Sequence, residues 1–119
     1  KRQLYKYTLN SFLALKIAFF NQIYTLFQSI EVAAEEYATT NNKRRDIQEY
    51  VDFIQALMQD HRIGPSHMYV PGQDGQYGFG GKCLPKDTAA LMREAKDLDV
   101  MFTILESAIK YNKIVREDI

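Results

Sequence analysis

The only cysteine of the chain, Cys83, stands where a thiol could act as a nucleophile. Lys82 and Lys86 flank it at the predicted start of a helix, and Asp87 follows it by four residues. Helix N-terminal N–H groups and nearby cations lower the pKa of a thiol and favour the thiolate. A spacing of four places Asp87 on the same helical face, where a carboxylate could handle a water or a proton. The position equally suits an inert cysteine buried as a small hydrophobic residue at a loop–helix junction.

Three glycines, Gly78, Gly80 and Gly81, precede the thiol. Glycine permits positive φ and a close approach of the backbone to a ligand. Before a helix N-terminus, such a loop can present N–H groups to an anion such as a phosphate. The pattern fits neither the P-loop nor the six-residue dinucleotide fingerprint, and a tight turn into the helix explains it equally well.

A second candidate pair, Lys6 and Asn10, lies near the start of the chain. The spacing of four residues puts both side chains on one face of a helix. A cation beside an amide could hold an alkoxide or a tetrahedral oxyanion. By itself the pair also fits two ordinary surface residues.

The elements that must position these residues are predicted to be helices. Residues 4 to about 38 contain no Gly or Pro, and apolar residues recur at helical spacing around most of the circumference. A helix that is apolar on two faces must be covered on two faces, so we expect a partner subunit as the second cover.

The rest of the chain predicts three shorter helices and a long loop. An amphipathic helix starts near Asn42, the glycine-rich segment 61–82 is irregular, and a helix starts at about Leu84 with Pro85 in its first turn. A last helix covers residues 102–115 and carries KYNK on its more polar side. Because no strand pattern occurs, the sequence predicts an all-α fold.

Composition and charge exclude several function classes. The 119 residues suit one domain, and 15 basic residues balance 15 acidic ones. With no net charge, we expect no nucleic-acid partner. The most apolar run, residues 12–20, is interrupted by Lys16 and falls short of the ~20 residues that span a bilayer. The first residues lack the order of a signal peptide, so we expect a cytoplasmic protein without a membrane partner.

A metal site is not expected. A single cysteine rules out an internal disulfide and a multi-cysteine zinc site. His61 and His67 stand six residues apart in the predicted loop without a third ligand nearby.

Three segments resemble the UDP-glucose/GDP-mannose dehydrogenase family. YGFGGKCLPKD, residues 77–87, resembles the thiol-containing signature of its UDP-glucose 6-dehydrogenase branch. KYTLNSFLALKIAFFNQI, residues 6–23, is similar to the segment that opens the family's central helix. DHRIG followed by VPG, within residues 60–72, is similar to its intervening loop. The three matches lie in the family's order.

The resemblance implies an architecture. Proteins of the family have an NAD-binding Rossmann domain, a helical central domain that forms the dimer, and a nucleotide-sugar-binding domain. Residues 1–119 match the central part, a helical dimerisation domain as in the 6-phosphogluconate dehydrogenase C-terminal-like fold. The implied partner is a second copy, bound through the long N-terminal helix, and the NAD-binding and UDP-binding domains lie outside this chain.

The resemblance also implies a chemistry, in which C6 of UDP-glucose is oxidised twice, two NAD are reduced and UDP-glucuronate forms for polysaccharide biosynthesis. Cys83 would attack the intermediate aldehyde to give a thiohemiacetal, and the thioester formed next would be hydrolysed. Lys6 would stabilise the developing oxyanion, Asn10 would position the sugar, and Asp87 would act with a water in proton transfer.

Binding roles follow from the same motif. Arg62 would reach the substrate from the neighbouring subunit, and Cys83 and Lys86 would border the nicotinamide of NAD. The backbone of the loop before the thiol would cradle the sugar and diphosphate, through Tyr77, Gly78, Phe79, Gly80 and Gly81.

The sequence departs from the family pattern at two places, and three alternative functions stay open. Gln22 stands where the family often has an acid, and residues 29–59 lack a frequent Gly-x-Asp turn. The Tyr–Gly before FGG and the Lys–Asp after CLP favour UDP-glucose over GDP-mannose, which remains the alternative substrate. The chain could instead be a non-catalytic dimerisation module, or a regulatory module that binds phosphate through its glycine loop.

Overall fold

A computed structural model describes residues 2–35 and 43–116. Its helices are α1 (Arg2–Glu35), α2 (Lys43–Met58), α3 (Cys83–Asp97) and α4 (Thr103–Val115). No strand occurs in the described residues, so the all-α prediction and its long N-terminal helix are confirmed. The expected end of the first helix near 38 and the expected start of the second near 42 lie outside the described ranges.

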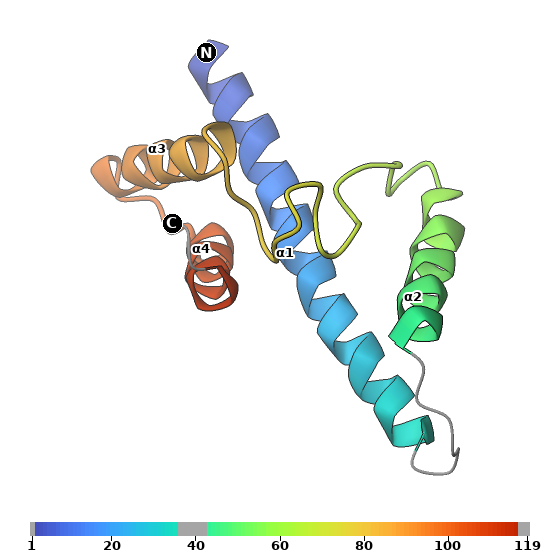
Figure 1. The fold of residues 1–119 in the computed structure, drawn as a ribbon. Helices are drawn as coiled ribbons and strands as arrows, with labels where there is room; N and C mark the ends of the chain where they lie inside the picture. Colours follow the sequence, from blue (N-terminus) through green and yellow to red (C-terminus); the bar gives the residue numbers. More distant parts are fainter. Residues whose placement is uncertain (1, 36–42, 117–119) are drawn as a thin grey trace.

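Helix α1 is the axis on which the other elements are arranged (Figure 1). The start of α3 abuts its N-terminal half, α4 lies below α3 on the same side, and α2 lies on the other side. The loop between α2 and α3 crosses the middle of α1. The Lys16 ammonium donates hydrogen bonds to the carbonyls of Ile63 and Gly64, at 2.8 and 3.2 Å, and so holds this loop to α1.

Two apolar clusters form the core. The larger one joins α1, α2 and the loop and consists of Phe20, Tyr24, Tyr50, Ile54, Met68 and Val70. The Tyr50 hydroxyl donates to the carbonyls of Phe20 and Met68 at 3.3 and 3.0 Å, and burial raises its pKa well above the ordinary value. The smaller cluster contains Ala14, Ala18, Phe79 and Ala108. Because Ala14 and Ala18 are small and one turn apart, Phe79 and α4 can approach α1 closely.

A second apolar stripe on α1 is left uncovered by the described residues. We call it the α1 seam, and its exposed members are Tyr5, Leu9, Phe12, Phe19, Leu26 and Ile30. Four of them are seven residues apart in sequence, which is the repeat of a helix that packs along another helix. Helix α1 is therefore apolar on two faces, as its sequence predicts, and the described residues cover one of them.

Within residues 2–35 and 43–116, no helix combines the length and hydropathy that a bilayer crossing requires.

Candidate active site

Asp87 brings α3 and α1 together through a polar contact. Its side chain is 1% exposed, and its Oδ2 accepts a hydrogen bond of 2.6 Å from the Asn10 amide. The Lys6 ammonium lies 4.0 Å from the same oxygen and is largely exposed. Lys6 and Asn10 stand one turn apart on α1, as the sequence predicts. Three of the four candidate catalytic residues are thus neighbours.

The second oxygen of Asp87 is free to accept a hydrogen bond. Oδ1 is buried and has no hydrogen-bond partner among the described residues. Buried carboxylate oxygens are almost always hydrogen-bonded, to protein or to ordered water. An unpaired carboxylate oxygen next to an amide and an ammonium is therefore a group that could take a proton.

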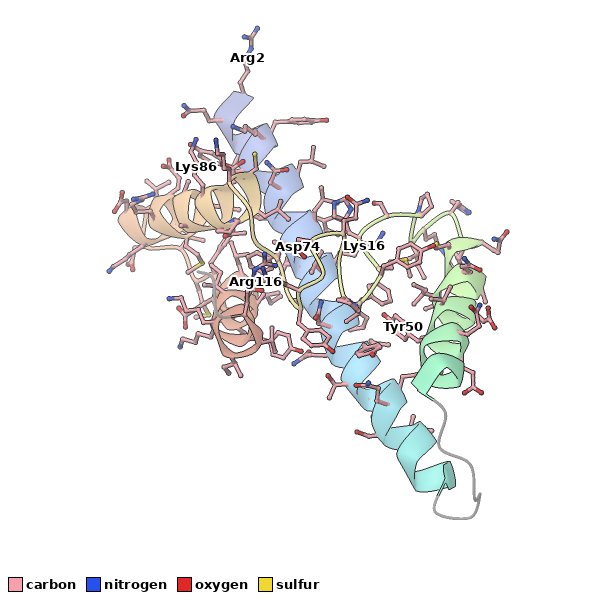
Figure 2. All side chains as sticks on the ribbon, in the orientation of Figure 1. Arg2, Lys16, Tyr50, Asp74, Lys86 and Arg116 are labelled. Atoms are coloured by element: carbon pink, nitrogen blue, oxygen red, sulfur yellow. The ribbon has the colours of Figure 1, made fainter. Side chains whose placement is uncertain are left out.

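Cys83 is the first residue of α3, one position before the predicted start. It is a free and exposed thiol, which does not fit an inert cysteine buried in the core. The preceding residue, Lys82, provides no side-chain cap to the helix. The thiol therefore lies beside first-turn N–H groups that no capping side chain takes. Lys86 is exposed near the same end of α3 (Figure 2).

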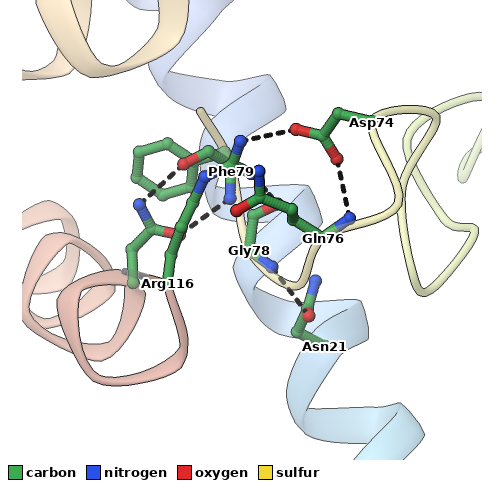
Figure 3. Close-up of polar contacts among 7 residues, drawn as sticks. Asn21, Asp74, Gln76, Gly78, Phe79 and Arg116 are labelled. Atoms are coloured by element: carbon green, nitrogen blue, oxygen red, sulfur yellow. Dashed lines mark hydrogen bonds and ion pairs between the residues drawn. The ribbon is translucent and has the colours of Figure 1, made fainter. Parts of the chain in front are cut away.

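The glycine loop is held from inside the protein. The Gly78 N–H donates to Asn21 Oδ1 at 2.9 Å, and the Phe79 N–H donates to Asn112 Oδ1 at 2.7 Å (Figure 3). Both residues are buried, with Gly78 at a φ of +72°. These two N–H groups are therefore occupied, and the exposed end of the loop at Gly81 is the part left open to a ligand.

A cavity of about 370 Å³ lies beside the loop. Its walls come from the loop between α2 and α3, from α1 and from the first turn of α3: Ile17, His67, Tyr69, Gly72, Gln73, Asp74, Gly78, Phe79, Gly80 and Leu84. Since Leu84 follows the thiol directly, the cavity adjoins the start of α3. Its volume is within the range of small-molecule sites.

Arg62 lies outside this cluster. Its guanidinium pairs with the neighbouring Asp60, with Nε and NH2 at 2.9 and 2.6 Å from the two carboxylate oxygens. This pair holds the pKa of the Asp60 carboxyl below its usual value. Arg62 lies in the loop that follows α2, and α2 lies across α1 from α3 (Figure 1). Within one chain it is therefore not brought to Cys83.

The side chains that hold the loop were not predicted from the sequence. Asn112 is fully buried, so KYNK is not simply the polar side of α4, contrary to expectation. Arg116 is 4% exposed and forms an ion pair of 2.5 Å with Asp74. Asn21 is buried on α1, beside the exposed Gln22. The available signal was a polar residue that lies one helical turn from buried apolar residues.

Comparisons with known proteins agree on one family. The family model described as "UDP-glucose/GDP-mannose dehydrogenase family, central domain" matches residues 48–114. The chain is 34% identical to a GDP-mannose 6-dehydrogenase of Pseudomonas aeruginosa, over 92% of this chain and 21% of that protein. It is 30% identical to a UDP-glucose 6-dehydrogenase of Rhizobium meliloti, over 92% of this chain and 20% of that protein.

A UDP-glucose 6-dehydrogenase of Rickettsia typhi is 34% identical, over 94% of this chain and 21% of that protein. The chain thus spans about a fifth of the length of the curated relatives it matches. No solved structure matches it.

Proposed function

The chain belongs to the UDP-glucose/GDP-mannose dehydrogenase family, and we propose that residues 1–119 are the central dimerisation domain of an NAD-dependent UDP-glucose 6-dehydrogenase. The observation that carries the proposal is the contact of Lys6 and Asn10 on α1 with Asp87 on α3. Helix α3 begins at the exposed Cys83, one turn before Asp87. The NAD-binding and UDP-binding domains belong to parts of the protein outside this chain.

The proposed reaction has two oxidations at one carbon. Bound NAD would accept a hydride from C6 in each, and the exposed Cys83 and Lys86 leave room for its nicotinamide at the start of α3. In the first oxidation the C6 hydroxyl would lose its proton to Asp87 through a water molecule, while Lys6 and Asn10 bind the oxygen. The sugar aldehyde that results stays in reach of the thiol.

Capture of the aldehyde explains the need for a thiol. Cys83 Sγ bonds to C6, and the Lys6 ammonium stabilises the oxyanion of the thiohemiacetal. The second oxidation converts this adduct to a thioester. A water then attacks C6, Asp87 takes its proton, and the C6–Sγ bond breaks to release the carboxylate and regenerate the thiolate. The unpaired Oδ1 of Asp87 supports this role.

A second candidate function is the oxidation of GDP-mannose. The chain is as similar to the Pseudomonas aeruginosa GDP-mannose enzyme as to the Rickettsia typhi UDP-glucose enzyme. Overall similarity therefore does not separate the two sugars, and the Tyr–Gly and Lys–Asp pairs around FGG and CLP are the features that favour UDP-glucose.

The test is the stoichiometry of the full-length enzyme. We expect two NADH for each UDP-glucose consumed, with little NADH from GDP-mannose at the same concentration. Absorbance at the NADH band and chromatography of the sugar nucleotides measure both quantities. Two NADH from GDP-mannose alone would reverse the substrate assignment, and no NADH from either sugar would leave a dimerisation or phosphate-binding module.

We also propose that the α1 seam is the homodimer interface. Monomeric proteins rarely leave a long apolar stripe uncovered, and a seven-residue repeat suits the same helix of a second copy. Glutamate at both Phe12 and Phe19 would put charge into this contact. We expect the dissociation constant of the full-length dimer to rise at least about 100-fold, because about 2.7 kcal/mol or more of apolar burial is lost.

Analytical ultracentrifugation measures this change. The double variant Gln55→Glu and Ala56→Glu adds the same charge to exposed positions of α2 and should leave the dimer intact. A dimer of unchanged affinity in the Phe12/Phe19 variant would place the interface elsewhere.

A further inference from the structure

Asn112 uses its whole amide on one residue of the glycine loop. Its Oδ1 accepts the Phe79 N–H at 2.7 Å, and its Nδ2 donates to the Phe79 carbonyl at 2.8 Å. The two residues are 33 positions apart in the sequence, and Asn112 is fully buried. Such a two-bond contact imitates a strand partner and fixes the position of Phe79 through both of the peptide groups that flank it.

Two further side chains complete the hold on the loop. Asn21 of α1 accepts the N–H of Gly78, and the Arg116 guanidinium donates to the Gly78 carbonyl at 3.3 Å. All four backbone polar groups of Gly78 and Phe79 are therefore bonded to side chains of α1 and of the end of α4. We call Asn21, Asn112 and Arg116 the amide clamp.

The clamp also accounts for two of the glycines. A Cβ on Gly78 would overlap Asn112 Oδ1, and a Cβ on Gly80 would overlap the Arg116 guanidinium. Asp74 holds that guanidinium in place. The loop therefore needs glycine at these positions for the approach of its own clamp, and this need exists before any ligand binds.

We propose that Asn112 is a positioning residue that aligns Cys83 with the sugar, an inference that rests on the proposed function. Asn112 is buried and cannot touch a substrate, so it acts through the loop. Phe79 precedes the thiol by four residues, and a displacement of about 1 Å at a reacting group can cost 100-fold in rate. Without the clamp, Phe79 would keep two buried polar groups unpaired and the loop would shift to satisfy them.

The test uses the full-length enzyme with Asn112→Ala and a matched variant, Leu105→Ala. Leu105 is buried two turns earlier on α4, so its truncation destabilises the same helix without removing a loop hydrogen bond. Thermal melting sets a temperature at which both variants are folded. We expect kcat/KM of Asn112→Ala to fall about 30- to 100-fold, with a much smaller change in Leu105→Ala.

A second measurement distinguishes a misplaced thiol from a smaller amount of folded enzyme. A misplaced thiol captures the aldehyde slowly. We therefore expect Asn112→Ala to release at least about tenfold more free sugar aldehyde per NADH formed than Leu105→Ala does. This ratio does not depend on how much enzyme is folded. Equal ratios and equal kcat/KM values in the two variants would overturn the inference.

Failure of the proposed function would be recognised separately. If the wild-type enzyme oxidises neither sugar, hydrogen exchange of the Gly78 and Phe79 amides still tests whether Asn112 holds the loop. At least about tenfold faster exchange in Asn112→Ala than in Leu105→Ala would support it, and equal exchange would overturn it.

Discussion

Serine in place of Cys83 is expected to stop uronate formation in the full-length enzyme. A hydroxyl at this position is a far weaker nucleophile than a thiolate, so the aldehyde from the first oxidation is no longer captured. We expect the rate of UDP-glucuronate formation to fall at least about 1,000-fold. The first oxidation needs no thiol, so aldehyde and its single NADH should still form slowly.

Quantification of uronate, aldehyde and NADH in one reaction measures this loss. Ala89→Ser adds a hydroxyl to an exposed position on the same helix and should behave as the wild type. Uronate production by Cys83→Ser at the wild-type rate would remove the thiol from the mechanism and revive the non-catalytic alternatives.

Helical periodicity predicted most of the fold because each helix has a clear apolar face. The long N-terminal helix followed from a run without Gly or Pro, and the glycines and Pro85 predicted the start of α3 to within one residue. The angle at which α3 meets α1 could not be predicted. It depends on contacts between distant residues, such as Asn10 with Asp87, and no local pattern encodes such a pair.

Within the candidate site, the proximity of two residues could be predicted where both lie on one helix. Lys6 with Asn10, and Cys83 with Asp87, are both separated by four residues, and a helix turns that spacing into proximity. The amide clamp was missed because Asn21 and Asn112 each stand beside another polar residue, Gln22 and Lys113, and so look like part of a solvated face. Their partner is a backbone segment tens of residues away, so their role became visible only with the fold.

Asp87→Asn is expected to separate activity from stability. The change keeps the size of the side chain and its ability to accept the hydrogen bond from Asn10, and it removes the base. We expect thioester hydrolysis to slow about 100- to 10,000-fold. The enzyme would then release a burst of NADH and stop with the sugar bound to Cys83, which intact-protein mass spectrometry detects as an added mass.

The same variant should not lose stability. The Asp87 carboxylate is buried and accepts one hydrogen bond, from Asn10, and its ammonium partner, Lys6, lies at 4.0 Å and is 56% exposed. A partly exposed pair at this distance contributes little, whereas the burial of a carboxylate with an unpaired oxygen carries a penalty. We therefore expect the Tm of Asp87→Asn to stay the same or rise.

Asp97→Asn, on an exposed turn of the same helix, controls for the loss of one negative charge and should change neither activity nor Tm. A large fall in Tm with full hydrolysis in Asp87→Asn would make the carboxylate a structural anchor between α1 and α3. Lost hydrolysis at an unchanged or higher Tm would show that the Asp87 carboxylate is not such an anchor. It would indicate that this electrostatically unfavourable group is kept because the chemistry requires it.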